Sequence, residues 1–142
     1  MTSTTSIAHP LVRAPGAPGL LPHVGAAVNI LVRAADTDGA WSMLDYTMPP
    51  RFAGPPAHRH AHTTETFYCV AGEAAVVPPG VAHAFANASD APAKMLVHLT
   101  PGGFEAYFDD LAALLRASEA WPPRDPFAVA RLALPYDIQP AV

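Results

Sequence analysis

The chain has 142 residues and a formal net charge of −4, a length that predicts one domain. It has no basic run that could follow a phosphate backbone, so we do not expect a nucleic-acid partner. No apolar run approaches the ~20 residues that a membrane helix needs, and the first residues lack the pattern of a signal peptide. We therefore expect no membrane partner and a cytoplasmic location. The single cysteine, Cys69, excludes an intramolecular disulfide.

Residues 1–24 contain four prolines and two glycines. Proline has no N–H for a sheet ladder, and it breaks helices beyond the first turn. We expect this segment to form an extended N-terminal arm outside the main domain.

The pattern of apolar and polar residues predicts a β-hairpin after this arm. In residues 26–34 valine and isoleucine alternate with other residues, as in a half-buried strand. Residues 36–39 carry a turn signal, and residues 41–48 form the second strand. Four further strands are predicted at residues 66–70, 75–77, 82–87 and 94–100.

The end of the chain has a helical pattern instead. Residues 104–120 carry an apolar stripe made of Phe104, Phe108, Leu111 and Leu115. A second short helix should begin at Asp125-Pro126 and continue through residue 132. We predict an all-β barrel over residues 25–101 and a helical segment, residues 102–142, packed on it.

Three histidines and one glutamate stand out in the middle of the chain. His58 and His60 lie two residues apart, so on a strand their side chains share one face, about 6.5–7 Å apart. A turn at residues 63–64 would bring Glu65 back to the same side, and His83 opens a later strand. Three imidazoles and one carboxylate suit a single divalent transition metal, namely iron, nickel, cobalt, manganese or zinc.

Other residues near this cluster are candidates for the reaction and the substrate pocket. His62 has the strand parity of His58 and His60, so it is a candidate spare ligand or catalytic base, although an exposed histidine is the commoner case. Four apolar residues are candidates to line a pocket for an apolar ligand, with ordinary barrel core as the alternative. They are Phe67, Phe85, Trp41 and Met43.

The same residues match the two motifs of the cupin superfamily. The first motif is H-x-H, four residues, Glu, six residues and Gly, and it is met by His58, His60, Glu65 and Gly72. The second is Gly, five residues, P-x-G, two residues, His, three residues and Asn, and it is met by Gly72, Pro78, Gly80, His83 and Asn87. Residues 25–135 resemble the small single-domain cupins described as quercetinase-like.

One departure separates this chain from most cupins. Gly72 serves both motifs, so the β-hairpin that normally lies between them is absent. The resemblance then implies a shortened jelly-roll, or double-stranded β-helix, with the strand that carries His83 at an open sheet edge. Such an edge invites pairing with another chain. We therefore expect a homodimer, with this edge near its interface and the N-terminal arm lying across it.

The resemblance also implies a function. It predicts a metal-dependent oxidoreductase of the dioxygenase type that acts on a small organic, aromatic or flavonoid-like substrate. Glu65 would then be both a metal ligand and the catalytic base. Two alternatives use the same residues: a cyclase or isomerase of polyketide-type substrates, with Glu65 or His62 moving protons, and a non-enzymatic small-molecule-binding cupin. The sequence leaves these alternatives open.

Overall fold

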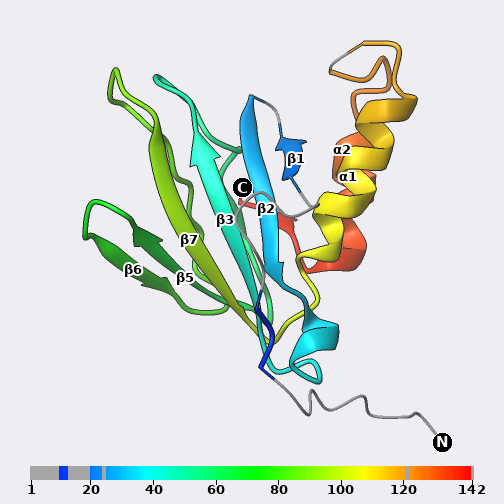
Figure 1. Ribbon diagram of the computed structural model, residues 1–142. Coiled ribbons are helices and arrows are strands. Elements are labelled where there is room, and N and C mark those ends of the chain that lie inside the picture. Colours follow the sequence, from blue (N-terminus) through cyan, green and yellow to red (C-terminus); the bar gives the residue numbers. More distant parts are fainter. Residues whose placement is uncertain (1–9, 13–19, 24, 121, 142) are drawn as a thin grey trace, which may run out of the picture.

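The structure is a computed structural model that describes residues 10–12, 20–23, 25–120 and 122–141. Its centre is a six-stranded antiparallel sheet with the strand order β1-β2-β3-β7-β5-β6 (Figure 1). The strands are β1 (Leu20–His23), β2 (Ala26–Val32), β3 (Ser42–Met48), β5 (Thr64–Cys69), β6 (Ala74–Val77) and β7 (Ala93–Thr100). A second, two-stranded sheet pairs β4 (His58–Arg59) with β8 (Gln139–Pro140).

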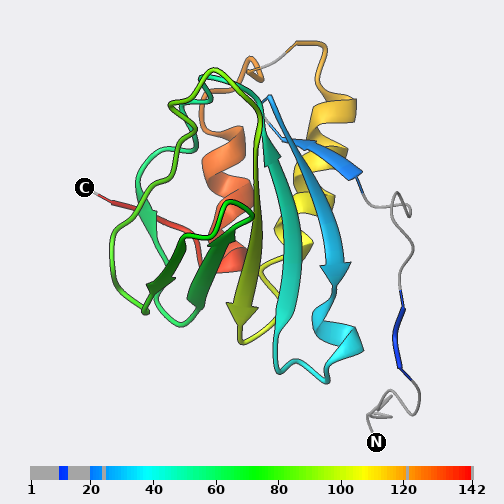
Figure 2. The same ribbon diagram turned by 60° about the vertical axis from the view of Figure 1, so that its left-hand side comes forward.

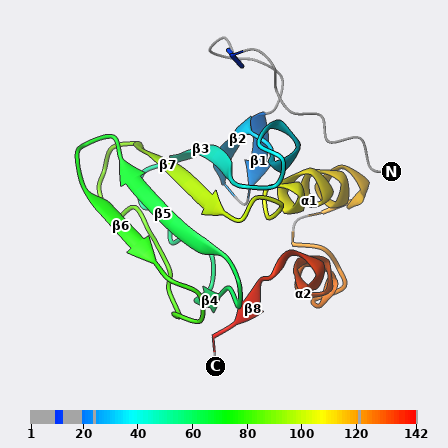
Figure 3. The same ribbon diagram turned by 90° about the horizontal axis from the view of Figure 1, so that it is seen from below.

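Two helices follow the main sheet, as the sequence predicts. They are α1 (Ala106–Ala117) and α2 (Ala128–Ala133), with short 3₁₀ turns η1 (Ala34–Asp36) and η2 (Leu134–Tyr136). Both helices lie on the same side of the sheet (Figures 2 and 3). Arg33 ties the end of β2 to α1 through two hydrogen bonds of 2.6 and 3.1 Å to Asp109. No helix in the described part of the chain is long and apolar enough to cross a membrane.

The core lies between the inner face of the main sheet and α1. Along β3 burial alternates strictly, so that Leu44 and Tyr46 point inward while their neighbours are only half-buried. The ring of Phe108 on α1 meets the ring of Tyr46 with centroids 6.4 Å apart. This packing confirms the predicted all-β domain with C-terminal helices.

The structure corrects two of the predicted elements. Residues 1–24 were expected to form no sheet hydrogen bonds, yet β1 pairs with β2. The pairing is possible because Gly25 makes the turn at φ +90° and because an edge strand tolerates a proline. The rest of the predicted arm lies outside the described residues, except residues 10–12. Residues 82–87 do not form a strand, and their ladder is limited to single bridges from His83 to His58 and from Asn87 to Phe52.

Asn87, the last residue of the second motif, is buried and closes a turn. Its side-chain amide donates to the carbonyls of Pro49 (2.9 Å) and Ala91 (2.8 Å), and its oxygen accepts from the Ser89 N–H. These bonds fix the end of the segment that begins at His83.

The connection between β5 and β6 confirms that no further hairpin lies between the two motifs. The strands pair directly through a turn at residues 70–73, where Gly72 adopts φ +111°. The main sheet therefore does not close, because β6 ends it and pairs with β5 alone among the described residues. The open edge belongs to β6 and not, as expected, to the segment of His83, which is bridged to β4.

We predict that a second copy of the chain covers this edge. Tyr68, Val70 and Val76 lie on and beside the edge hairpin and are 47%, 58% and 63% exposed, so pairing would remove apolar surface from water as well as satisfy the free ladder groups. Light scattering at micromolar concentration should give twice the 14.9 kDa of one chain. A monomeric mass, unchanged on deleting residues 1–20, would contradict both the dimer and the role of the arm.

Candidate metal centre

The two histidines of the H-x-H motif enter the site from a short strand outside the main sheet. His58 lies in β4 and His60 follows directly after it, where its side chain is 1% exposed. Their rings meet edge to face with centroids 5.1 Å apart. The two rings therefore lie next to each other, as their spacing in the sequence predicts.

Glu65 and His83 complete the group from two other segments. Glu65 is the first inward-facing residue of β5, and His83 is held against His58 by two backbone hydrogen bonds of 2.9 and 3.0 Å. The potential ligand atoms of all four residues lie within 4.8 Å of one another. The structure thus brings together the four residues that the sequence predicts as ligands.

Each histidine ring in the group is oriented by a backbone carbonyl. A carbonyl oxygen only accepts, so Nδ1 carries the hydrogen in every ring, and in a neutral ring the lone pair is on Nε2. The three bonds run from His58 to Pro56 (2.9 Å), from His60 to Asp137 (2.8 Å) and from His83 to Val81 (3.0 Å). The fold therefore directs the Nε2 atoms toward a common centre.

Glu65 sits at this centre with its Oε2 atom close to two of the rings. Oε2 lies 2.7 Å from Nε2 of His83 and 3.2 Å from Nε2 of His60. Burial would raise the pKa of Glu65, but the hydrogen bonds from His60 and His83 outweigh it and lower the pKa to about 2. The contact with Glu65 in turn raises the pKa of His83.

These contacts require a cation. Two lone pairs at such distances repel unless a proton or a metal ion lies between them, and Nδ1 already holds the hydrogen of each neutral ring. Ligand atoms about 2.0–2.2 Å from a divalent ion lie roughly 3–3.5 Å from one another, which agrees with the 3.2 Å between Glu65 and His60. The 2.7 Å between Glu65 and His83 is the length of a hydrogen bond from a protonated His83, so these two atoms would have to move apart to bind one ion. Burial also lowers the pKa of His58, which favours the neutral form that binds a metal. The residues present therefore fit one divalent transition metal.

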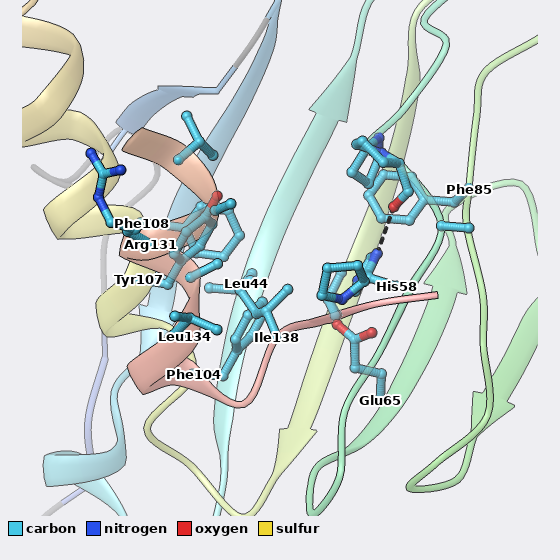
Figure 4. A pocket seen from close by; sticks show the side chains of 18 of the residues that line it. Leu44, His58, Glu65, Phe85, Phe104, Tyr107, Phe108, Arg131, Leu134 and Ile138 are labelled. Atoms are coloured by element: carbon cyan, nitrogen blue, oxygen red, sulfur yellow. Dashed lines mark hydrogen bonds between the residues drawn. The ribbon is translucent and has the colours of Figure 1, made fainter. Parts of the chain in front are cut away.

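The centre opens into a cavity of about 720 Å³ between the main sheet and the C-terminal residues (Figure 4). His58 and Glu65 form part of its wall, and most of the remaining wall is apolar and aromatic. Its aromatic lining consists of Tyr46, Phe67, Phe85, Phe104, Tyr107, Phe108 and Phe127. Arg131 also lines the cavity, on the side opposite His58 and Glu65 (Figure 4).

Two of the four predicted pocket residues line this cavity and two do not. Phe67 and Phe85 lie in its wall, with ring centroids 5.7 Å apart. Trp41 and Met43 are on the opposite face of the sheet, because Leu44 and its inward-facing neighbours take the cavity side of β3. The Trp41 ring instead meets the His98 ring, with centroids 5.2 Å apart. Their assignment to the pocket is corrected accordingly.

His62 is not part of the centre. It is exposed, it does not line the cavity, and it is not in the group of potential ligands. The strand ends before it, since β4 stops at Arg59, and the alternation that holds for His58 and His60 does not continue into the turn. The structure therefore places this predicted catalytic residue away from the site.

Asp137 is a residue of the site that the sequence analysis missed. Besides orienting His60, it accepts hydrogen bonds at its carboxylate from the backbone of residues 61–63. Burial would raise the pKa of Asp137, but these amide bonds hold it below its usual range. No local pattern marks the residue, because its partners lie more than 70 positions earlier in the chain.

Comparisons with known proteins bear on the fold. No protein-family model and no curated protein sequence matches the chain. The chain is similar to a solved structure from Klebsiella pneumoniae, which is described as a conserved protein with a double-stranded β-helix domain. The TM-score is 0.50 and the sequence identity 17%, and the match covers 59% of this chain and 84% of that chain. A single-residue mutant of oxalate decarboxylase from Bacillus subtilis gives a TM-score of 0.52 and 18% identity, over 60% of this chain and 28% of that chain.

These likenesses agree with the two motifs and with the open sheet described above. The chain therefore has a double-stranded β-helix fold, in a shortened form.

Proposed function

We propose that this protein is a metal-dependent oxidoreductase of the dioxygenase type that acts on a small, largely apolar organic molecule. The observation that carries the proposal is the position of the metal centre in the wall of the apolar cavity. His58 and Glu65 belong to both. A ligand in the cavity would therefore meet the metal at one point and aromatic side chains elsewhere.

The shape and lining of the cavity support an aromatic, flavonoid-like substrate. Its volume of about 720 Å³ lies within the range of roughly 300–1,000 Å³ typical of small-molecule pockets. Flat rings pack well against Phe67, Phe85 and Phe104, which surround the part of the cavity near the metal centre. A polar group on such a substrate is best placed at the metal, because the neighbouring wall offers few other polar partners.

The residues of the site have separate roles in this proposal. His58, His60, Glu65 and His83 hold the metal, which when bound supplies a Lewis acid and, for a redox-active ion, an electron-transfer centre. Both histidine contacts of Glu65 use Oε2, so Oε1 is the atom assigned to accept a substrate proton. The apolar wall offers few hydrogen-bonding partners to water near this transfer.

The donor set favours a second candidate function. Three imidazoles and a carboxylate hold redox-inactive Zn²⁺ as readily as Fe²⁺, and with zinc the same centre would catalyse an oxygen-independent cyclisation or isomerisation of a polyketide-type substrate. An oxygen electrode with flavonoid and polyketide-type substrates separates the two. Oxygen uptake that matches substrate loss supports the dioxygenase, and substrate conversion without uptake supports the second. Binding without conversion would identify a non-enzymatic binding protein.

The first prediction for this proposal concerns metal content. Replacing His60 by Ala should abolish stoichiometric metal, because His60 is buried and its Nε2 faces Glu65 at 3.2 Å. His62→Ala is the matched control, since it removes an exposed histidine two residues away and should keep the metal. Elemental analysis of the purified proteins checks both. Equal metal content in the wild type and in His60→Ala would place the metal elsewhere.

The second prediction concerns Glu65. Glu65→Gln should keep part of the metal, because three imidazoles remain, but it loses the proton acceptor. We expect turnover of the converted substrate to fall by roughly 10²- to 10⁴-fold per bound metal, the usual contribution of a general base. Steady-state rates normalised to metal content measure this. Wild-type turnover in the variant would show that Glu65 moves no proton.

A further inference from the structure

The C-terminal strap, residues 137–141, is the ladder partner of the strand that carries the first metal ligand. His58 pairs with Pro140 and Arg59 with Gln139, and the Ala141 N–H donates to the Ala57 carbonyl at 3.1 Å. Figure 3 shows β8 lying beside β4, away from the main sheet. The short H-x-H strand is thus held from one side by the end of the chain.

Asp137 begins the strap and contacts the metal centre with two different groups. Its backbone carbonyl accepts the Nδ1–H of His60 at 2.8 Å. Its carboxylate accepts the N–H groups of Ala61 (2.7 Å), His62 (2.8 Å) and Thr63 (3.0 Å), and also the Thr63 hydroxyl at 3.1 Å. One residue therefore holds both a ligand ring and the turn that follows it.

That turn sets the position of two ligands relative to each other. Residues 61–63 are the connection between His60 and β5, which carries Glu65. A shift of this turn would change the distance between Nε2 of His60 and Oε2 of Glu65, which is 3.2 Å. Asp137 also has a left-handed backbone, with φ 61°, a conformation that aspartate, asparagine and glycine tolerate better than other residues.

We propose that Asp137 is a positioning residue through which the C-terminal strap sets the metal affinity of the centre. The inference rests on the proposed metal centre, and it assigns to the strap a role that neither motif contains. Groups that orient metal ligands from outside typically change metal affinity by about 10- to 100-fold when they are removed. The carboxylate contacts the turn, and Asp137 does not line the cavity, so we expect its effect on binding of the metal.

The test uses two variants of the full chain. Asp137→Gly keeps the left-handed backbone and the carbonyl that orients His60, and removes only the carboxylate. Asp137→Asn keeps one acceptor oxygen and should restore part of the loss. Asp125→Asn is the matched control, because Asp125 also caps a backbone N–H in the C-terminal segment, that of Phe127 at 2.9 Å, away from the ligands.

The main readout is Co²⁺ affinity, measured by competition with a chelating dye, together with the absorption spectrum of the bound Co²⁺. We expect Asp137→Gly to weaken Co²⁺ binding by about 10- to 100-fold and to alter the absorption spectrum. The Co²⁺ affinity of Asp137→Asn should lie between those of Asp137→Gly and the wild type, and Asp125→Asn should match the wild type. A folded Asp137→Gly with affinity within about twofold of the wild type and an unchanged spectrum would overturn the inference.

A metal-free readout keeps the inference separate from the proposed function. In metal-free protein, hydrogen exchange of the amides of residues 61–63 should be faster in Asp137→Gly than in the wild type, because these amides donate to the carboxylate. Unchanged exchange would show that the carboxylate does not hold the turn, and would overturn the inference.

A wild type that binds no Co²⁺ would overturn the proposed metal centre and the role of Asp137 with it. If Asp137→Gly does not fold, the same comparisons on Asp137→Asn decide.

Discussion

The site depends on three hydrogen bonds between histidine rings and backbone carbonyls. Because each Nδ1–H donates to a carbonyl, the Nε2 lone pairs of His58, His60 and His83 must face inward, toward the carboxylate of Glu65. A buried group of acceptors without a cation is unfavourable, so the arrangement calls for a proton or a metal ion. The three carbonyls come from separate parts of the chain, and the centre therefore exists only when all three parts are folded together.

In the shortened barrel the C-terminal residues form part of this centre. With the hairpin between the motifs absent, the second sheet consists of β4, β8 and the bridge to His83. The end of the chain pairs with the ligand strand, and the residues before it, including Leu134 and Ile138, form a wall of the cavity. The same segment that orients His60 thus also bounds the space in which a substrate would bind.

Much of this could be predicted from the sequence, and most of the failures have physical causes. The two-residue spacing brought His58 and His60 together, because His60 follows directly after β4, but the same parity failed for His62, which lies in the turn. On β3 the alternation itself indicated the inner face, because Met43 shares its side with Asp45 and Thr47 while Leu44 lies on the other, apolar side, and this signal was overlooked. Asp137 was missed because its role depends on contacts across more than 70 residues, which leave no local pattern.

The most direct test of the account is X-ray absorption spectroscopy at the metal edge of the reconstituted protein. A metal held by His58, His60, Glu65 and His83 should give a first shell of nitrogen and oxygen atoms at roughly 2.0–2.2 Å, with the multiple-scattering pattern of three imidazoles. A sulfur shell, or a first shell without imidazole scattering, would contradict this ligand set. Either result would mean that the three inward-facing Nε2 atoms do not bind the metal.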